Sequence, residues 1–153
     1  NLVFTELVEI VMGNHGTFDK FLGDAIMAFY GAPLSGDDDA ERALRSALEM
    51  QQRFKQLQAE TPDQLLMSLD LGVGIHSGEV IVGNIGSERV MDYTVIGDPV
   101  NVARRLQETA EGGQVLISGE TKRQVDNAQV EYLGEKLLHG RDAPVEVFAL
   151  QAL

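Results

Sequence analysis

The segment FDKFLGDAIMAFYG, residues 18–31, consists of two short apolar runs separated by a Leu-Gly-Asp turn. This pattern predicts an antiparallel hairpin with its turn at Gly23 and Asp24. Three charged residues, Asp19, Lys20 and Asp24, interrupt the apolar pattern, and an unpaired charge in a packed interior is costly. An aspartate beside a turn glycine is common, whereas a lysine in the middle of an apolar strand requires an explanation.

Length and composition predict one domain over residues 1–153. The chain is 44% hydrophobic and 24% charged, which is typical of a packed globular domain. Its 24 acidic and 12 basic residues give a net charge of −12, which argues against a nucleic-acid partner. An anionic ligand would therefore need a site with its own local positive charge or a metal ion.

The sequence carries no sign of a disulfide, a membrane span or an export signal. It has no cysteine, and its apolar runs are only a few residues long. We therefore expect a cytoplasmic domain that makes no membrane contact itself, although a parent protein could be anchored.

Periodicity predicts an α+β fold in which helices pack on a mixed sheet. The second half contains glycines at 72, 74, 78, 83 and 86 that do not match a dinucleotide fingerprint. Glycine inside strands instead indicates close approach of another backbone or a ligand. The expected elements are a helix at 2–13, hairpins at 17–21/25–30 and 68–75/79–82, a helix from 37, a strand at 93–96, a helix at 98–110, a strand at 115–117, a helix at 120–125 and closing strands at 130–133 and 145–150.

Asn101 and Arg105 are the clearest candidates for chemistry on spacing alone. They lie four residues apart near the start of a predicted helix and so share one face. An amide and a guanidinium there can grip an anionic oxygen, but a surface arginine beside a first-turn asparagine explains the same spacing. The three histidines show no zinc-ligand spacing. These patterns alone indicate an α+β domain with a candidate anion site.

Four longer motifs, in this order, are more specific. The stretch GTFDKFLGDAIMAFYGAP resembles the metal-binding hairpin of the class III nucleotidyl cyclases. The stretches GVGIHSGEVIVGNIG and MDYTVIGDPVNVARRLQ resemble the next hairpin and the nucleotide-binding motif of that family, and LGEKLLHGRDAPVEVFAL resembles its closing strand pair. The resemblance implies a ferredoxin-like, palm-type mixed sheet with packed helices.

The resemblance also implies an activity, which is adenylyl cyclase: conversion of ATP to 3′,5′-cyclic AMP and pyrophosphate. Two Mg²⁺ or Mn²⁺ ions would support attack of the ribose 3′-oxygen on the α-phosphate at sites shared across a homodimer. Asp24 would bind metal, and Lys20 and Thr94 would read adenine in the partner's site.

Three further residues complete the site that the resemblance implies. Asn101 would orient the ribose, Arg105 would stabilise charge on the α-phosphate, and Arg89 would contact the triphosphate. His139 stands where the family usually has a lysine, and Arg104 where a small residue is usual.

The family's first metal aspartate, on an N-terminal strand, has no counterpart here. Glu6 and Glu9 lie on the first predicted helix, and Asp19 should face away from Lys20 by strand alternation. We therefore expect an N-terminally truncated domain, with its first strand missing, that turns over little ATP by itself. The alternative is a non-catalytic cyclase-homology domain for dimerisation or nucleotide sensing. A diguanylate cyclase is disfavoured because its Gly-Gly-Asp/Glu-Glu-Phe signature is absent.

Overall fold

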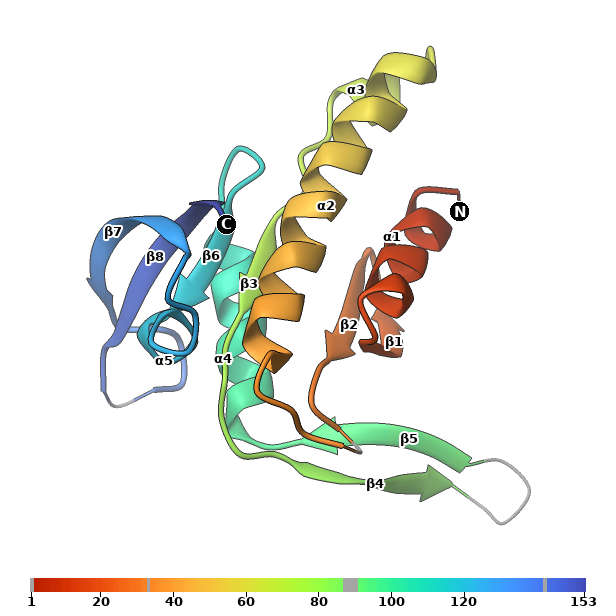
Figure 1. Cartoon of the computed structure of the whole chain (residues 1–153). Helices are drawn as coiled ribbons and strands as arrows, with labels where there is room; N and C mark the ends of the chain where they lie inside the picture. Colours follow the sequence, from red (N-terminus) through yellow and green to blue (C-terminus); the bar gives the residue numbers. More distant parts are fainter. Residues whose placement is uncertain (1, 33, 87–90, 142) are drawn as a thin grey trace.

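The structure is a computed structural model that describes residues 2–32, 34–86, 91–141 and 143–153. Helices and strands alternate with hairpins along the chain (Figure 1). The elements are α1 (Leu2–Gly13), β1 (Thr17–Leu22), β2 (Ala25–Phe29), α2 (Asp39–Glu60), α3 (Gln64–Met67), β3 (Val73–Ile75), β4 (Ile81–Gly86), β5 (Met91–Ile96), α4 (Asp98–Thr109), β6 (Val115–Ser118), α5 (Gly119–Lys122), β7 (Gln129–Lys136) and β8 (Val145–Ala152).

The described strands form three sheets. The four-stranded sheet has the order β3-β6-β8-β7, with β3 parallel to β6 and the other pairs antiparallel. The β1–β2 and β4–β5 pairs form separate antiparallel hairpins. The mixed α+β architecture agrees with the sequence prediction, and so does the hairpin about Gly23 and Asp24.

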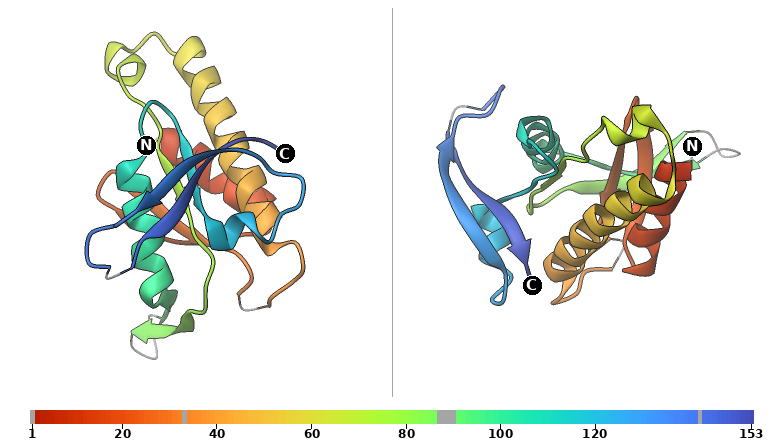
Figure 2. Two further views of the ribbon diagram at one scale, coloured as in Figure 1. Left: turned by 90° about the vertical axis from the view of Figure 1, so that its left-hand side faces the viewer. Right: turned by 90° about the horizontal axis from the view of Figure 1, so that it is seen from above.

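Two helices cover opposite faces of the four-stranded sheet, as Figure 2 shows for α2 and α4. Because side chains alternate along a strand, Val115 and Ile117 of β6 pack in the α2 cluster, whereas Leu116 packs in the α4 cluster. All four residues of β6 are buried. This explains why the sequence of β6 is a continuous apolar run rather than an alternating one.

A third apolar cluster joins α1 to the first hairpin. Leu7 and Val11 of α1 are buried with Met50 of α2, and Ile26 and Ala28 of β2 pack against them. In Figure 1 this unit lies on the other side of α2 from the four-stranded sheet. The hairpin is therefore positioned by α1 and α2.

The predicted hairpin over 68–75 and 79–82 is wrong. β3 pairs with β6, and β4 pairs with β5 (Val82 opposite Val95). The chain does not fold back at Ser77 and Gly78. Gly78 instead lies against the start of α4, where an added Cβ would lie within 3.0 Å of the Pro99 ring. The chain runs on into β4, and β4–β5 extends away from the rest of the fold (Figure 1).

Gly74 fixes the distance between β3 and α4. A Cβ at this position would lie within 3.0 Å of the carbonyl oxygen of Ala103 and the amide nitrogen of Gln107 in the α4 backbone. The expected close backbone approach at these glycines is confirmed here. The helix that carries Asn101 and Arg105 therefore sits where only glycine permits it.

We expect Gly74→Ala to destabilise the fold, because α4 must move away from the sheet to make room. Overpacking of this kind costs about 1–3 kcal/mol. Gly13→Ala is the matched control, since a Cβ there meets nothing within 4 Å, and this change should be neutral or slightly stabilising. Urea unfolding of both variants tests the argument, and equal free energies of unfolding would contradict it.

Candidate active site

A polar pocket lies at the start of α4. Its volume is about 280 Å³. One wall is the first turns of α4, with Asn101 and Arg105, and the other is the turn that precedes β8, with His139 and Arg141. The structure thus brings together the two residues that were predicted from spacing.

The wall formed by α4 follows from the way in which this helix begins and packs. Gly97 is the N-cap, with a φ of 149°, and Pro99 follows in the first turn. Asp98 is the first helical residue. Val102 and Leu106 are fully buried, and Asn101 and Arg105, each one residue earlier, lie on the adjacent and less buried face of the helix.

The second wall is a tight turn that the core holds in place. Leu138 is buried in the apolar cluster of α4, β6 and β8. Gly140 adopts a φ of 84°, and the Arg141 amide donates to the Leu138 carbonyl at 3.1 Å. The turn therefore projects His139 and Arg141 over the start of α4.

Both arginines of the pocket have carboxylate partners. Arg105 donates to both oxygens of Glu108 at 3.2 Å, and Arg141 binds Asp98. In a chain of net charge −12, this is a local gathering of cationic groups. The sequence analysis did not single out Arg141, and the available signal was a basic residue directly after a turn glycine.

Lys20 and Asp24 do not line this pocket. Both lie on the β1–β2 hairpin and are exposed. A bulge at Asp19 interrupts strand pairing, and it brings the buried Asp19 carboxylate (3% exposed) to 3.9 Å from the Lys20 ammonium. The Asp19 side chain is buried and the Lys20 side chain is 46% exposed, so the opposite orientation of the two residues stays a prediction, although the bulge interrupts the regular alternation of side chains.

Thr94 and Arg89 are the other two predicted site residues. Thr94 lies on β5, where its backbone is opposite Gly83, but its side chain is outside the described part of the chain. Arg89 is outside the described residues altogether. The strand that carries Thr94 lies against β1, so Lys20 and Thr94 belong to neighbouring strands.

A buried polar network lies beside the pocket. The Nδ1 atom of His76 is 2.7 Å from the Ser118 hydroxyl, which caps α5 and approaches Thr121 at 3.3 Å. Burial lowers the pKa of His76; Glu120 and Asp98 oppose this shift, and Arg141 reinforces it. The network ties the end of β3 to β6 and α5.

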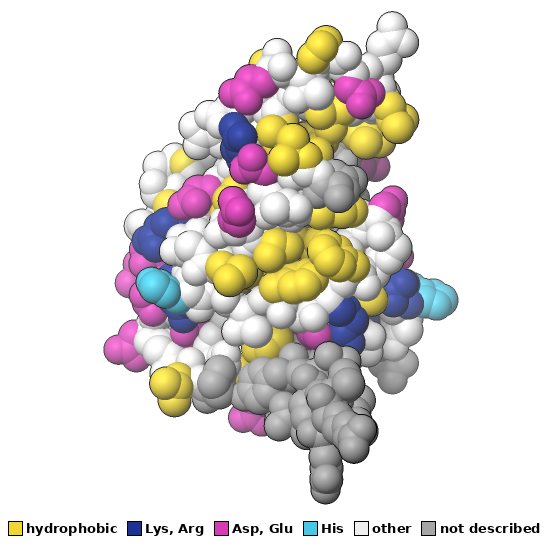
Figure 3. Space-filling view, turned by 90° about the vertical axis from the view of Figure 1, so that its right-hand side faces the viewer, with side chains coloured by type: hydrophobic (Ala, Val, Ile, Leu, Met, Phe, Trp, Pro, Cys, Tyr) yellow, Lys and Arg dark blue, Asp and Glu magenta, His cyan; other side chains and the backbone are white. Residues whose placement is uncertain are grey.

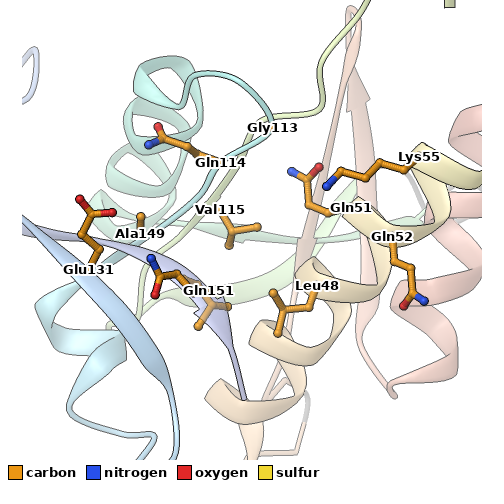
Figure 4. Close-up of a pocket in the computed structure, with 11 residues that line it drawn as sticks. Leu48, Gln51, Gln52, Lys55, Gly113, Gln114, Val115, Glu131, Ala149 and Gln151 are labelled. Atoms are coloured by element: carbon orange, nitrogen blue, oxygen red, sulfur yellow. The ribbon is translucent and has the colours of Figure 1, made fainter. Parts of the chain in front are cut away.

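A second hollow, of about 480 Å³, lies between α2 and the β6–β8 edge (Figure 4). Glutamine side chains from α2, from β8 and from the loop before β6 surround it, together with Lys55 and Glu131. None of the predicted site residues lines this hollow.

The described residues of one chain do not assemble a metal site. No group of three or more His, Asp or Glu side chains among them could hold an ion. Asp24 offers one exposed carboxylate, and the Asp19 carboxylate is turned to Lys20. The described residues therefore do not fit a complete two-ion centre.

The chain belongs to the family of adenylate and guanylate cyclase catalytic domains, which it matches over residues 1–152. It is 37% identical over 154 residues to an uncharacterized protein of Mycobacterium tuberculosis, covering 96% of this chain and 25% of that protein. It is 32% identical over 143 residues to adenylate cyclase 1 of Rhizobium meliloti, covering 92% and 22%. The chain thus spans about a quarter of the length of these curated relatives.

Solved structures agree with this assignment. The adenylyl cyclase CyaB of P. aeruginosa superimposes with a TM-score of 0.89 at 31% identity, over all of this chain and 80% of that one. The guanylyl cyclase Cya2 superimposes with a TM-score of 0.91 at 35% identity, over 98% and 77%. The predicted class III cyclase fold is confirmed, and these neighbours include cyclases of both base specificities.

No helix in the described ranges combines the length and apolar character needed to cross a membrane.

The lowered pKa of His76 predicts a pH effect on stability. Below a pH of about 6.5, the ordinary pKa of histidine, His76 binds a proton in the unfolded chain but stays neutral in the folded chain until the pH is lower. Stability is therefore lost as the pH falls from about 7 toward 5, by at most about 1.4 kcal/mol per pH unit.

His76→Asn should keep the hydrogen bond to Ser118 and remove this titration. Urea unfolding between pH 7.5 and 5.5 should show the wild type losing more stability than the variant. Parallel pH profiles would contradict the assignment.

Proposed function

We propose that this chain is the catalytic domain of an adenylyl cyclase that converts ATP to 3′,5′-cyclic AMP and pyrophosphate within a homodimer. The observation that carries the proposal is the pocket at the start of α4, where Asn101 and Arg105 face a cationic turn in an acidic chain. Membership of the cyclase family supports a nucleotide as the ligand.

The chemistry asks these residues to position the substrate and to stabilise charge. The Asn101 amide would orient the ribose, so that its 3′-oxygen lies in line with the bond to pyrophosphate. The Arg105 guanidinium would stabilise negative charge that develops on the α-phosphate, as preorganised donors do in phosphoryl transfer. Arg105 would exchange Glu108 for phosphate, since that exposed pair is weak.

We propose Asp24 as one carboxylate ligand for Mg²⁺ or Mn²⁺. Two such ions, when bound, would polarise the α-phosphate and favour the ionised 3′-oxygen. Asp24 is exposed at the hairpin turn and accessible to an ion.

A second copy of the chain would bring the two half-sites together. Asp24 lies outside the pocket that holds Asn101 and Arg105, which is the arrangement that a shared site requires. Phe21 lies on the same hairpin as Asp24 and is 55% exposed. Figure 3 shows hydrophobic side chains gathered on the face where α1 and the hairpin lie, as an interface between copies would have.

Adenine would be read by Lys20 and Thr94, on the neighbouring strands β1 and β5. Lysine can donate a hydrogen bond to an acceptor nitrogen of adenine, whereas guanine presents a donor at the same edge. These two residues are the basis for preferring ATP over GTP.

The alternative function is a non-catalytic cyclase-homology domain that binds nucleotide or dimerises. The observation in its favour is that the described residues gather no metal site. Formation of cyclic AMP by the complete gene product that contains this chain separates the two functions.

Exchange of the base-reading residues should erode the preference for ATP. We expect Lys20→Glu with Thr94→Cys to lower kcat/KM for ATP relative to GTP, because each polar mismatch that the bound base buries costs about 1–3 kcal/mol. Steady-state kinetics with both nucleotides measure the ratio. An unchanged ratio would refute this pair as the base readers.

Mixing two inactive variants tests the shared site. Asp24→Ala and Arg105→Ala should each lower kcat by at least about 10²–10³-fold, whereas Arg104→Ala removes a neighbouring exposed arginine and is the control. Mixed dimers would contain one intact site of two, so random pairing should restore about a quarter of wild-type activity.

No restoration, with subunit exchange confirmed by differently tagged chains, would show that both residues act within one subunit.

A further inference from the structure

The turn that faces α4 carries Arg141, an arginine to which the proposed reaction assigns no role. Arg141 lines the same pocket as Asn101 and Arg105. Its side chain is 27% exposed and binds the carboxylate of Asp98, which is 64% exposed. An ion pair this accessible to water contributes little to stability, so the fold alone does not explain an arginine directed into the pocket.

We propose that Arg141 binds the terminal phosphates of the nucleoside triphosphate and that Asp98 is its resident counter-ion, displaced when the triphosphate enters. This inference rests on the proposed function, because it assumes that the pocket holds the triphosphate of that substrate.

The geometry of the turn supports a binding role. Leu138 anchors the turn in the core, and the Gly140 conformation directs the following residue back toward α4. Arg141 is thus held near the pocket by buried structure on its own side of the turn. A planar guanidinium presents paired donors that match phosphate oxygens.

The two arginines of the pocket show the same arrangement. Arg105 is held by Glu108, and Arg141 by Asp98. Each guanidinium therefore has one carboxylate partner that a polyanion can replace. Asp98 and Glu108 stand at opposite ends of α4, so Arg141 would meet phosphate near the helix start, where amide dipoles also favour negative charge.

A purely structural role is the competing explanation. In that case the Asp98–Arg141 pair is a latch that fixes the turn to α4. Loss of either partner would then open the pocket and weaken ligand binding in the same direction. A phosphate-binding role predicts opposite effects, because loss of Asp98 frees Arg141, whereas loss of Arg141 removes the binding group.

Calorimetric titration of the chain with inorganic tripolyphosphate separates these explanations. We expect Arg141→Gln to weaken binding about tenfold or more and Asp98→Asn to tighten it about two- to fivefold at low salt. Arg123→Gln is the matched control, since Arg123 is an exposed arginine paired with Glu146 at 3.1 Å, and its loss should change affinity less than about twofold.

Several results would overturn the inference: no binding of tripolyphosphate by the wild type, unchanged binding by Arg141→Gln, or weakening by both Arg141→Gln and Asp98→Asn. If Arg141→Gln does not fold, as judged by circular dichroism, the direction of the Asp98→Asn effect decides alone, because exposed Asp98 tolerates substitution.

The proposed function can fail separately. Tripolyphosphate binding that depends on Arg141, without cyclic AMP formation by the complete gene product, would refute the cyclase activity and leave this site intact. Cyclic AMP formation that Arg141→Gln does not alter would refute only the role of Arg141.

Discussion

The α4 backbone lies against Gly74 of β3 with no room for a Cβ atom between them, and the position of the candidate site follows from that contact. Val102 and Leu106 bury one face of α4 on the sheet, which leaves Asn101 and Arg105 on the adjacent, less buried face. Leu138 enters the same apolar cluster from the opposite wall. One packing arrangement thus sets both sides of the pocket.

Electrostatics explain why this pocket differs from the rest of the surface. A chain with a net charge of −12 repels an anion at long range, so a phosphate site must be built from local donors. Two arginines, an asparagine amide and a histidine meet at the start of α4. Glu108 and Asp98 neutralise the two arginines of the pocket in the absence of a ligand. Both carboxylates are exposed, so a phosphate can replace them as partners of the arginines.

Local signals in the sequence predicted local structure well. The hairpin about Gly23 and Asp24 and the helix with Asn101 and Arg105 depend on neighbours within a few residues, and both form as expected. The hairpin about Ser77 was wrong because a contact distant in sequence, between Gly78 and Pro99, keeps the chain extended. Arg141 was missed for the same reason, since its meeting with Asp98 joins residues far apart in the chain. The bulge at Asp19 has no reliable sequence signal, so the sequence did not indicate this break in strand pairing.

The central claim is that Asp24 of one copy completes the site of Asn101 and Arg105 on another. A crystal structure of the complete gene product with a non-hydrolysable ATP analogue tests it most directly. We predict the adenine against Lys20 and the α-phosphate against Arg105 of one subunit, with Asp24 of the partner subunit at the metal ion beside the phosphates. A nucleotide site that takes both Asp24 and Arg105 from a single subunit would contradict the account.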